Sequence, residues 1–171
     1  MYSIKTMTMA LVLALTLGIT GCGSSKKKAN NASGTNASME SSDGSSTEFE
    51  LNGDSDSGKA GSLQTVTFGF NSATLSSSAR SALDNNAQIL KNNDDVEVQV
   101  EGHCDERGGV QYNLALGENR ARAVKQYLVS MGVSSSRIST VSFGKERPIA
   151  FGHNESAWSK NRRANFVVTS K

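Results

Sequence analysis

The sequence predicts an α/β sandwich, a βαβαβ domain whose helices pack on one face of a single sheet. From residue 63 to 171, segments with alternating apolar residues take turns with segments whose apolar residues recur every three or four positions. This stretch has the length of one small domain and contains the single proline of the chain. Strands and helices in this order form a sheet with the helices laid against it.

The first two elements are a short strand and a helix. In "TVTFGF", which begins at Thr65, the residues Val66, Phe68 and Phe70 would share one face of the strand. Residues 76–92 start with serines, which cap helices well, and carry a helical apolar stripe of Ala79, Leu83, Ala87 and Leu90.

A second strand and a longer helix follow. "VEVQVEG" (96–102) alternates again, and a helix is expected from Val110, with a stripe of Gly117, Ala121, Val124, Leu128 and Met131. The helix should end at Gly132, which suits the left-handed position after a helix, and Val133 can make the usual hydrophobic contact. The last predicted elements are a strand at "RISTVSF" (137–143), a short helix (154–160) and a strand at "ANFVV" (164–168).

Residues 1–21 have the character of a secretory signal peptide. The apolar run "MALVLALTLGIT" is too short to span a bilayer as a stable helix. The tetrapeptide "ITGC", which ends at Cys22, has the order of a bacterial lipobox, where the chain is cut before an acylated cysteine. An ordinary signal peptide with a coincidental cysteine is the alternative. We expect no cofactor, but covalent S-diacylglycerol and N-palmitoyl groups at Cys22, which together form a stable anchor.

Residues 22–62 are predicted to be a lipidated N-terminus followed by a disordered linker. Ser, Gly, Asn, Asp and Lys dominate the segment, and Phe49 is its sole aromatic residue. Such a composition buries too little surface to offset chain entropy. Lys26 to Lys28 form a charge run that is either solvated or in contact with anionic lipid headgroups.

The predicted domain, residues 63–171, has little net charge. It contains 13 of the basic and 10 of the acidic residues. This small excess, without interleaved aromatic residues, argues against a nucleic-acid surface.

The run "EGHCDERGG" concentrates groups that could carry chemistry. Strand parity places Cys104 on the core side, and His103 and Asp105 on the other. Cys104 is interpreted as a small buried hydrophobe, because the lipid consumes Cys22 and leaves no disulfide partner. A metal site of His103, Asp105 and the distant His153 lacks a closed ligand set. A Cys/His catalytic pair fails, because the two side chains point to opposite faces.

Asp105 and Arg120 flank the opening expected between the second strand and the following helix. Asn113 and Arg120 lie two turns apart on one helix face, with Leu116 between them. The carboxylate and the guanidinium could pair with each other. Alternatively they divide a zwitterion, with an ammonium at Asp105 and a carboxylate in the bidentate fork of Arg120. The spacing leaves both interpretations open.

Three runs, "FGFN", "VEGHCDERGGVQYNLALGENRARAV" and "VSFGKERPIAFGHNESAWSKNRRA", resemble the peptidoglycan-associated lipoproteins of the OmpA-like domain family. The resemblance covers about Val66 to Val168. It implies an OmpA-like fold and non-catalytic binding of the peptidoglycan stem peptide, at meso-diaminopimelate, by Asp105 and Arg120. It also implies further binding positions at Phe70, Asn71, Leu116 and, in an "NRR" motif near the pocket, Asn161.

The same resemblance implies a place in the Tol-Pal system, with TolB and TolA as partners. The protein would be lipid-anchored in the outer membrane, with its domain in the periplasm, and would support envelope integrity and cell division. Gly23 is not the Asp that commonly retains lipoproteins at the inner membrane, which favours the outer membrane.

Two residues depart from the family pattern. Asn71 stands where relatives usually carry Asp, which removes a negative charge from the pocket rim. Cys104 stands where relatives usually carry a small residue, which agrees with a buried side chain.

Two alternative functions remain: a wall-binding lipoprotein of the same family outside the Tol system, and a wall-modifying metal-dependent enzyme. The sequence offers neither a nucleophile with its base nor a complete set of metal ligands, which argues against the enzyme.

Overall fold

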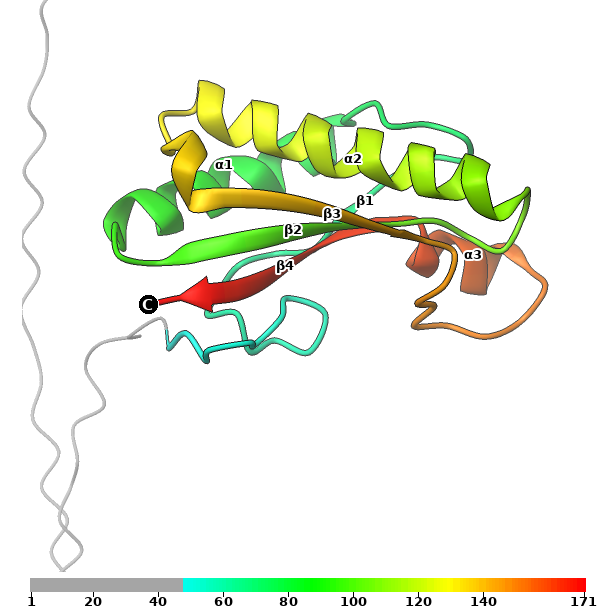
Figure 1. Cartoon of the computed structure of the whole chain (residues 1–171), viewed down its shortest axis with the longest axis horizontal. Coiled ribbons are helices and arrows are strands. Elements are labelled where there is room, and N and C mark those ends of the chain that lie inside the picture. The colour runs from blue at the N-terminus through cyan, green and yellow to red at the C-terminus, as the bar shows by residue number, and fades with distance from the viewer. Residues whose placement is uncertain (1–47) are drawn as a thin grey trace, which may run out of the picture. The chain divides into compact units, whose positions relative to one another are not determined.

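The computed structural model describes residues 48–171. The elements are β1 (Val66–Thr67), α1 (Ser77–Asn92), β2 (Glu97–His103), α2 (Val110–Ser130), the 3-10 helix η1 (Ser135–Arg137), β3 (Ile138–Gly144), α3 (Glu155–Asn161) and β4 (Arg163–Ser170). The strands form one sheet in the order β1-β4-β2-β3, with β2 and β3 parallel and β4 antiparallel to both its neighbours. Figure 1 shows α1 and α2 on the same side of this sheet, which confirms the predicted sandwich.

The core lies between the sheet and the two long helices. Helix α1 begins at its cap, Ser76, whose hydroxyl accepts a hydrogen bond from the N–H of Ala79 at 3.1 Å. The whole predicted stripe of α1 is buried. It packs with α2 against alternate residues of β2 and β4, and the core includes Leu83, Leu90, Val98, Val100, Val124, Leu128, Phe166 and Val168.

The C-terminus of α2 closes as the sequence predicted, with one exception. The N–H groups of Gly132 and Val133 donate to the carbonyl oxygens of Val129 and Leu128 at 3.0 and 3.1 Å, and Gly132 has a φ of +95°. These are the two bonds of a Schellman motif. Met131 was expected in the buried stripe but is exposed, because the helix ends there and the chain turns away.

Helix α2 crosses β2 at two glycines. A Cβ atom on Gly102 would lie 1.9 Å from the carbonyl oxygen of Gly117, and one on Gly117 would lie 2.3 Å from the hydroxyl of Ser142. Residues without side chains therefore permit the close approach of helix and sheet. This approach brings Asn113 and Arg120 of α2 to the carboxyl end of β2.

The first strand is shorter than its sequence pattern predicted. Val66 and Phe68 are buried, but Phe70 is 61% exposed. Strand β1 pairs with β4 only at Val66 and Thr67, and the chain then leaves the sheet. The prediction that Phe70 shares the buried strand face is therefore wrong, and Phe70 becomes available to a surface cavity.

The folded part begins before residue 63, where the predicted linker was expected to end. The N–H groups of Asn52 and Ser55 each donate to carbonyl oxygens of β4 at 2.9 Å. Phe49 and Ala60 are buried and belong to the core. Residues 48–62 are thus an ordered part of the domain, because one aromatic side chain and main-chain bonds to the part of β4 that β1 leaves unpaired offset their chain entropy. The predicted signal peptide, Cys22 and the linker up to residue 47 lie outside the described residues.

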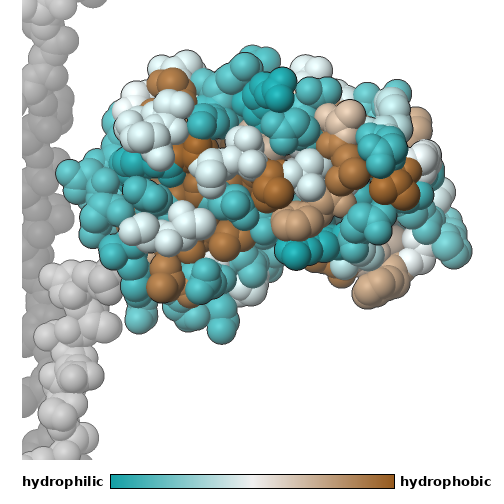
Figure 2. Space-filling model, viewed as in Figure 1, coloured by the Kyte–Doolittle hydropathy of each residue, from teal (hydrophilic) through white to brown (hydrophobic). Residues whose placement is uncertain are grey.

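The surface is mainly polar on the face that Figure 2 shows, with small separate patches of hydrophobic residues. No helix within residues 48–171 is long and apolar enough to cross a membrane.

Candidate functional site

A cavity of about 160 Å³ lies where β2 ends and α2 begins. Three segments line it: the loop after β1, the turn between β2 and α2, and the first turns of α2. The lining residues are Phe70, Asn71, Cys104, Asp105, Arg107, Gly108, Tyr112, Asn113, Leu116 and Arg120. The structure therefore brings together every predicted binding residue in the described chain except Asn161.

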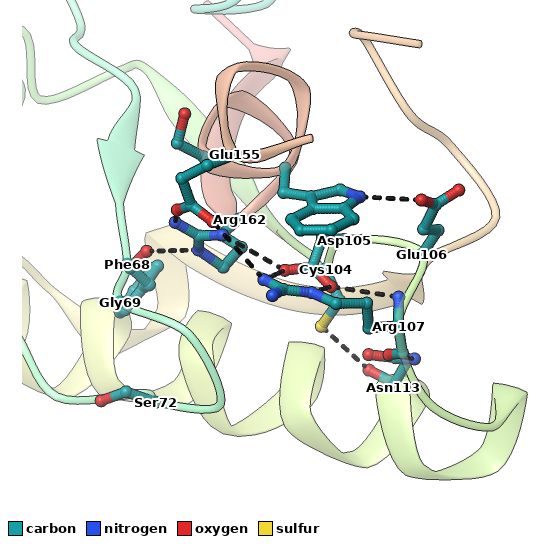
Figure 3. Close-up of polar contacts among 12 residues, drawn as sticks. Phe68, Gly69, Ser72, Cys104, Asp105, Glu106, Arg107, Asn113, Glu155 and Arg162 are labelled. Carbon is teal, nitrogen blue, oxygen red and sulfur yellow. Dashed lines mark hydrogen bonds and ion pairs between the residues drawn. The ribbon is translucent and has the colours of Figure 1, made fainter. Parts of the chain in front are cut away.

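Asp105 is almost completely buried, and two arginines bind its carboxylate. Arg107 donates from Nη2 to Oδ2 at 2.7 Å, and from Nε and its main-chain N–H to Oδ1 at 3.1 Å. Arg162 donates from Nη1 to Oδ2 at 3.3 Å. Figure 3 shows these contacts, in which Arg107 comes from the turn after β2 and Arg162 from the end of α3.

The surroundings of Asp105 keep it ionised. Burial alone would raise the pKa of its carboxyl group, but the hydrogen bonds from Arg107 and Arg162 together outweigh burial, so the pKa lies below its usual value. A fixed negative charge therefore stands in the cavity wall.

Arg120 lies behind the cavity surface and has no exposed area. Its Nε donates to the carbonyl oxygen of Ser72 at 2.8 Å, and its Nη2 to that of Gly69 at 3.0 Å. Its Nη1 donates to the carbonyl oxygen of His103 at 2.6 Å and to the sulfur of Cys104 at 3.4 Å. Arg120 thus fastens the loop after β1 to the end of β2, and burial lowers the pKa of its guanidinium.

The structure decides against a direct pair between Asp105 and Arg120. Within residues 48–171, no carboxylate lies within 4.0 Å of the Arg120 guanidinium. The guanidinium of Arg120 also does not have two parallel N–H groups free for the predicted bidentate contact with a carboxylate. Three main-chain carbonyl groups and a sulfur accept hydrogen bonds from four of its five N–H groups. One Nη2 hydrogen remains without an acceptor among the described residues. In the part of the chain that the structure describes, Arg120 therefore brings a buried positive charge with no carboxylate within 4.0 Å and one unused donor.

Asn161 does not reach the cavity. Its side-chain oxygen accepts from the N–H groups of Ile149 and Ala150 at 2.9 and 3.0 Å, and its amide donates to the carbonyl oxygen of Ala150 at 2.7 Å. Asn161 therefore supports the loop before α3. In the "NRR" motif it is the next residue, Arg162, that contacts the site through Asp105.

Arg107 is a site residue that the sequence analysis missed. Its guanidinium carbon lies 4.0 Å from the ring centres of both Phe70 and Trp158, so the cation contacts two aromatic rings while it binds Asp105. The available signal was an Arg two residues after an Asp in a tight turn. That signal is weak, because short-range charge pairs at turns are common on solvated surfaces.

The rim of the cavity combines aromatic and polar groups. Asn71 has a φ of +52°, in the left-handed region that Asn tolerates better than most residues. Its side-chain oxygen accepts a hydrogen bond from the hydroxyl of Tyr112. An Asn accepts this bond without adding a second negative charge beside Asp105. Leu116 and Phe70 supply the apolar part of the lining.

Cys104 is buried as predicted. It is 3% exposed, and its sulfur lies 3.4 Å from the carbonyl oxygen of Asn113 and from Nη1 of Arg120. Burial raises the pKa of its thiol despite the nearby guanidinium. The neutral thiol is a poor nucleophile, which agrees with the structural interpretation of this residue.

In the unlipidated Cys22→Ser protein, Cys104 is the remaining thiol, and it is expected to resist thiol reagents until the domain unfolds. Labelling would be followed by mass spectrometry with and without denaturant. Ser135→Cys in the same background places a thiol at an exposed position and is expected to react at once. Labelling of Cys104 as fast as that of the control would revive a chemical role for the thiol.

The three residues of the conceivable metal site do not meet. His103 lies 3.3 Å from Glu101, His153 lies 2.7 Å from Glu106, and Asp105 is bound by arginines. Within residues 48–171, no group of three His, Cys, Asp or Glu side chains could hold a metal ion.

Comparison with known proteins assigns the chain to a family. The OmpA family profile matches residues 67–162, more than half of the chain. A peptidoglycan-associated lipoprotein of Mesorhizobium japonicum is 42% identical over 157 residues, which cover 90% of this chain and 87% of that protein. A peptidoglycan-associated lipoprotein of Rhizobium meliloti is 38% identical over 170 residues, which cover 98% of this chain and 91% of that protein. The chain belongs to the OmpA family, among its peptidoglycan-associated lipoproteins.

A solved structure agrees with this assignment. The crystal structure of the peptidoglycan-associated lipoprotein from Burkholderia pseudomallei is 41% identical and has a TM-score of 0.59, covering 61% of this chain and 88% of that one. The OmpA-family domain is a binding module and not an enzyme. The cavity, in which the Asp105 carboxylate and the Arg120 guanidinium do not pair with each other, is the candidate binding site.

Proposed function

We propose that this OmpA-family lipoprotein holds the outer membrane to the cell wall by binding the stem peptide of peptidoglycan at meso-diaminopimelate. One observation carries the proposal: Asp105 and Arg120 border the same cavity without pairing with each other. A ligand end that bears both an ammonium and a carboxylate matches these two charges.

The chemistry of the proposed ligand follows from the charges of Asp105 and Arg120 at the cavity. The distal carbon of diaminopimelate carries an ammonium, which suits the carboxylate of Asp105, and a carboxylate, which suits the positive charge of Arg120. Since Arg120 has one unused N–H and no exposed surface, it would offer a single charge-assisted hydrogen bond after a small local movement. Such bonds contribute about 1.5 to 3 kcal/mol each, so a single site binds modestly. Many anchored copies on a polymeric wall would then hold firmly by avidity.

The proposed cellular setting rests on the chain outside the domain and on the relatives. Acyl groups at Cys22 would anchor the protein in the outer membrane, and the residues before the domain would span the gap to the wall. The names of the relatives support association with peptidoglycan. We place the protein in the Tol-Pal system with TolB and TolA as partners, which co-purification of TolB with the lipidated protein would test.

The ligand itself offers the sharpest test of the site. We expect the mature protein to bind the tripeptide L-Ala-γ-D-Glu-meso-diaminopimelate roughly 10- to 100-fold more tightly than the same tripeptide ending in L-Lys, as measured by titration calorimetry. The Lys peptide keeps the distal ammonium and lacks the carboxylate on the same carbon, and no protein residue is changed. Equal affinities would contradict a carboxylate site at Arg120.

Incubation with purified sacculi would separate binding from wall cleavage. A binder sediments with the sacculi and releases no soluble fragments, whereas a hydrolase releases them.

A further inference from the structure

Arg107 occupies the position next to Asp105 that a ligand ammonium would need. Its guanidinium contacts both carboxylate oxygens of Asp105, and its main-chain N–H binds one of them as well. The rings of Phe70 and Trp158 each contact the guanidinium, with their centres 4.0 Å from its carbon. The carboxylate is thus already saturated by a cation that belongs to the protein.

The two arginines at Asp105 differ in how firmly they are held. The side chain of Arg162 is 7% exposed, and its other N–H groups bind the carbonyl oxygen of Phe68 at 3.1 Å and the carboxylate of Glu155. The side chain of Arg107 is 30% exposed and lines the cavity, which Arg162 does not. Arg107 also sits in a turn, directly before Gly108. Of the two, Arg107 is the one that can move away without breaking the core.

We infer that Arg107 is an internal competitor: it holds Asp105 in the free protein and swings off the carboxylate when a ligand ammonium takes its place. This inference rests on the proposed function and adds to it a movement of the Arg107 side chain on ligand binding. The exchange replaces one cation at Asp105 by another, so the carboxylate is never left buried without a partner.

The displaced guanidinium keeps an anion of the protein within reach. Nη2 of Arg107 lies 3.9 Å from Oε2 of Glu155, whose side chain is largely exposed. Arg107 can therefore leave Asp105 towards Glu155, and the carboxylate of the ligand is left to Arg120.

Trp158 reports the position of Arg107. It is the single tryptophan of the chain, and Arg107 stacks on its ring. If Arg107 leaves Asp105 on binding, the stack is disturbed and the fluorescence of Trp158 changes.

The test uses the mature protein, the variant Arg107→Gln and the matched control Arg122→Gln. Arg122 is an exposed arginine of α2 that pairs with Glu118 away from the cavity. Each variant loses one positive charge by the same substitution, and Asp105 keeps Arg162 as its partner in both. The probe is the tripeptide that ends in meso-diaminopimelate, and the readouts are the dissociation constant and Trp158 fluorescence.

We expect the wild-type protein and Arg122→Gln to show a saturable fluorescence change on binding. Arg107→Gln should bind the tripeptide tighter, on the order of three- to tenfold, as expected for removal of one partly exposed competing charge pair. Its Trp158 signal should change little. Weaker or unchanged binding by Arg107→Gln, or saturation of the wild-type protein without a fluorescence change, would overturn the inference. Failure of the wild-type protein to bind the tripeptide at all would instead refute the proposed function.

Discussion

Replacing Arg120 by lysine is expected to remove most of the wall binding and to lower the free energy of unfolding by about 2 to 5 kcal/mol. The guanidinium binds three main-chain carbonyl groups, at Gly69, Ser72 and His103. A lysine keeps the charge, but its compact ammonium cannot reach three acceptors in different directions from this buried position. The loop that carries Phe70 and Asn71 should therefore loosen, and the cavity should lose one of its walls. Sacculus co-sedimentation and chemical denaturation measure the two effects.

A matched control separates loss of the site from loss of stability. Arg137 also donates to main-chain carbonyl groups, at Asn93 and Val96, but it does so beyond the opposite end of β2 from the cavity. Arg137→Lys is expected to lower stability by a similar mechanism and to leave wall binding by the folded protein unchanged. If both variants bound sacculi like the wild-type protein, Arg120 would be a structural residue and the ligand would bind elsewhere.

Asp105→Asn is the second change with a large expected effect. It removes the negative charge that Arg107 and Arg162 share, and a buried ion pair that loses one partner destabilises a protein by about 3 kcal/mol or more. We expect this loss in the free energy of unfolding at neutral pH, together with loss of binding to sacculi. Asp95→Asn makes the same chemical change at an exposed position and should alter stability by no more than about 0.5 kcal/mol.

The effect of Asp105→Asn should depend on pH in a defined direction. The pKa of Asp105 is lowered in the folded protein, so the folded state binds fewer protons than the unfolded chain, whose aspartates have a pKa of about 3.9. The stabilisation is complete above that unfolded-state pKa and is lost as the pH falls through the lower, folded-state pKa. Denaturation of both proteins across the acid range should show their stabilities converging. A difference that stayed constant with decreasing pH would contradict a stabilising carboxylate at this position.

The order of helices and strands could be predicted from the sequence because its signals are local. The stripe of α1, its serine cap and the glycine after α2 each involve residues within one or two turns of each other, and all appear in the structure. The same reasoning failed where burial depends on a distant partner. Composition gave no sign that residues 48–62 are ordered, because their order comes from bonds to the part of β4 that β1 leaves unpaired. Phe70 is exposed because β1 stops pairing three residues earlier.

The cavity residues were predicted, but their partners were not. Strand and helix periodicity, with the family resemblance, indicated that Asp105 and Arg120 flank one opening, and the structure places both on one cavity. Which charges meet there was decided by the tertiary structure alone. Asp105 binds an arginine 57 positions away, and Arg120 binds main-chain groups 17, 48 and 51 positions away. Several cations and acceptors compete within a few ångströms at this site, and the outcome depends on distances that spacing along the chain does not specify.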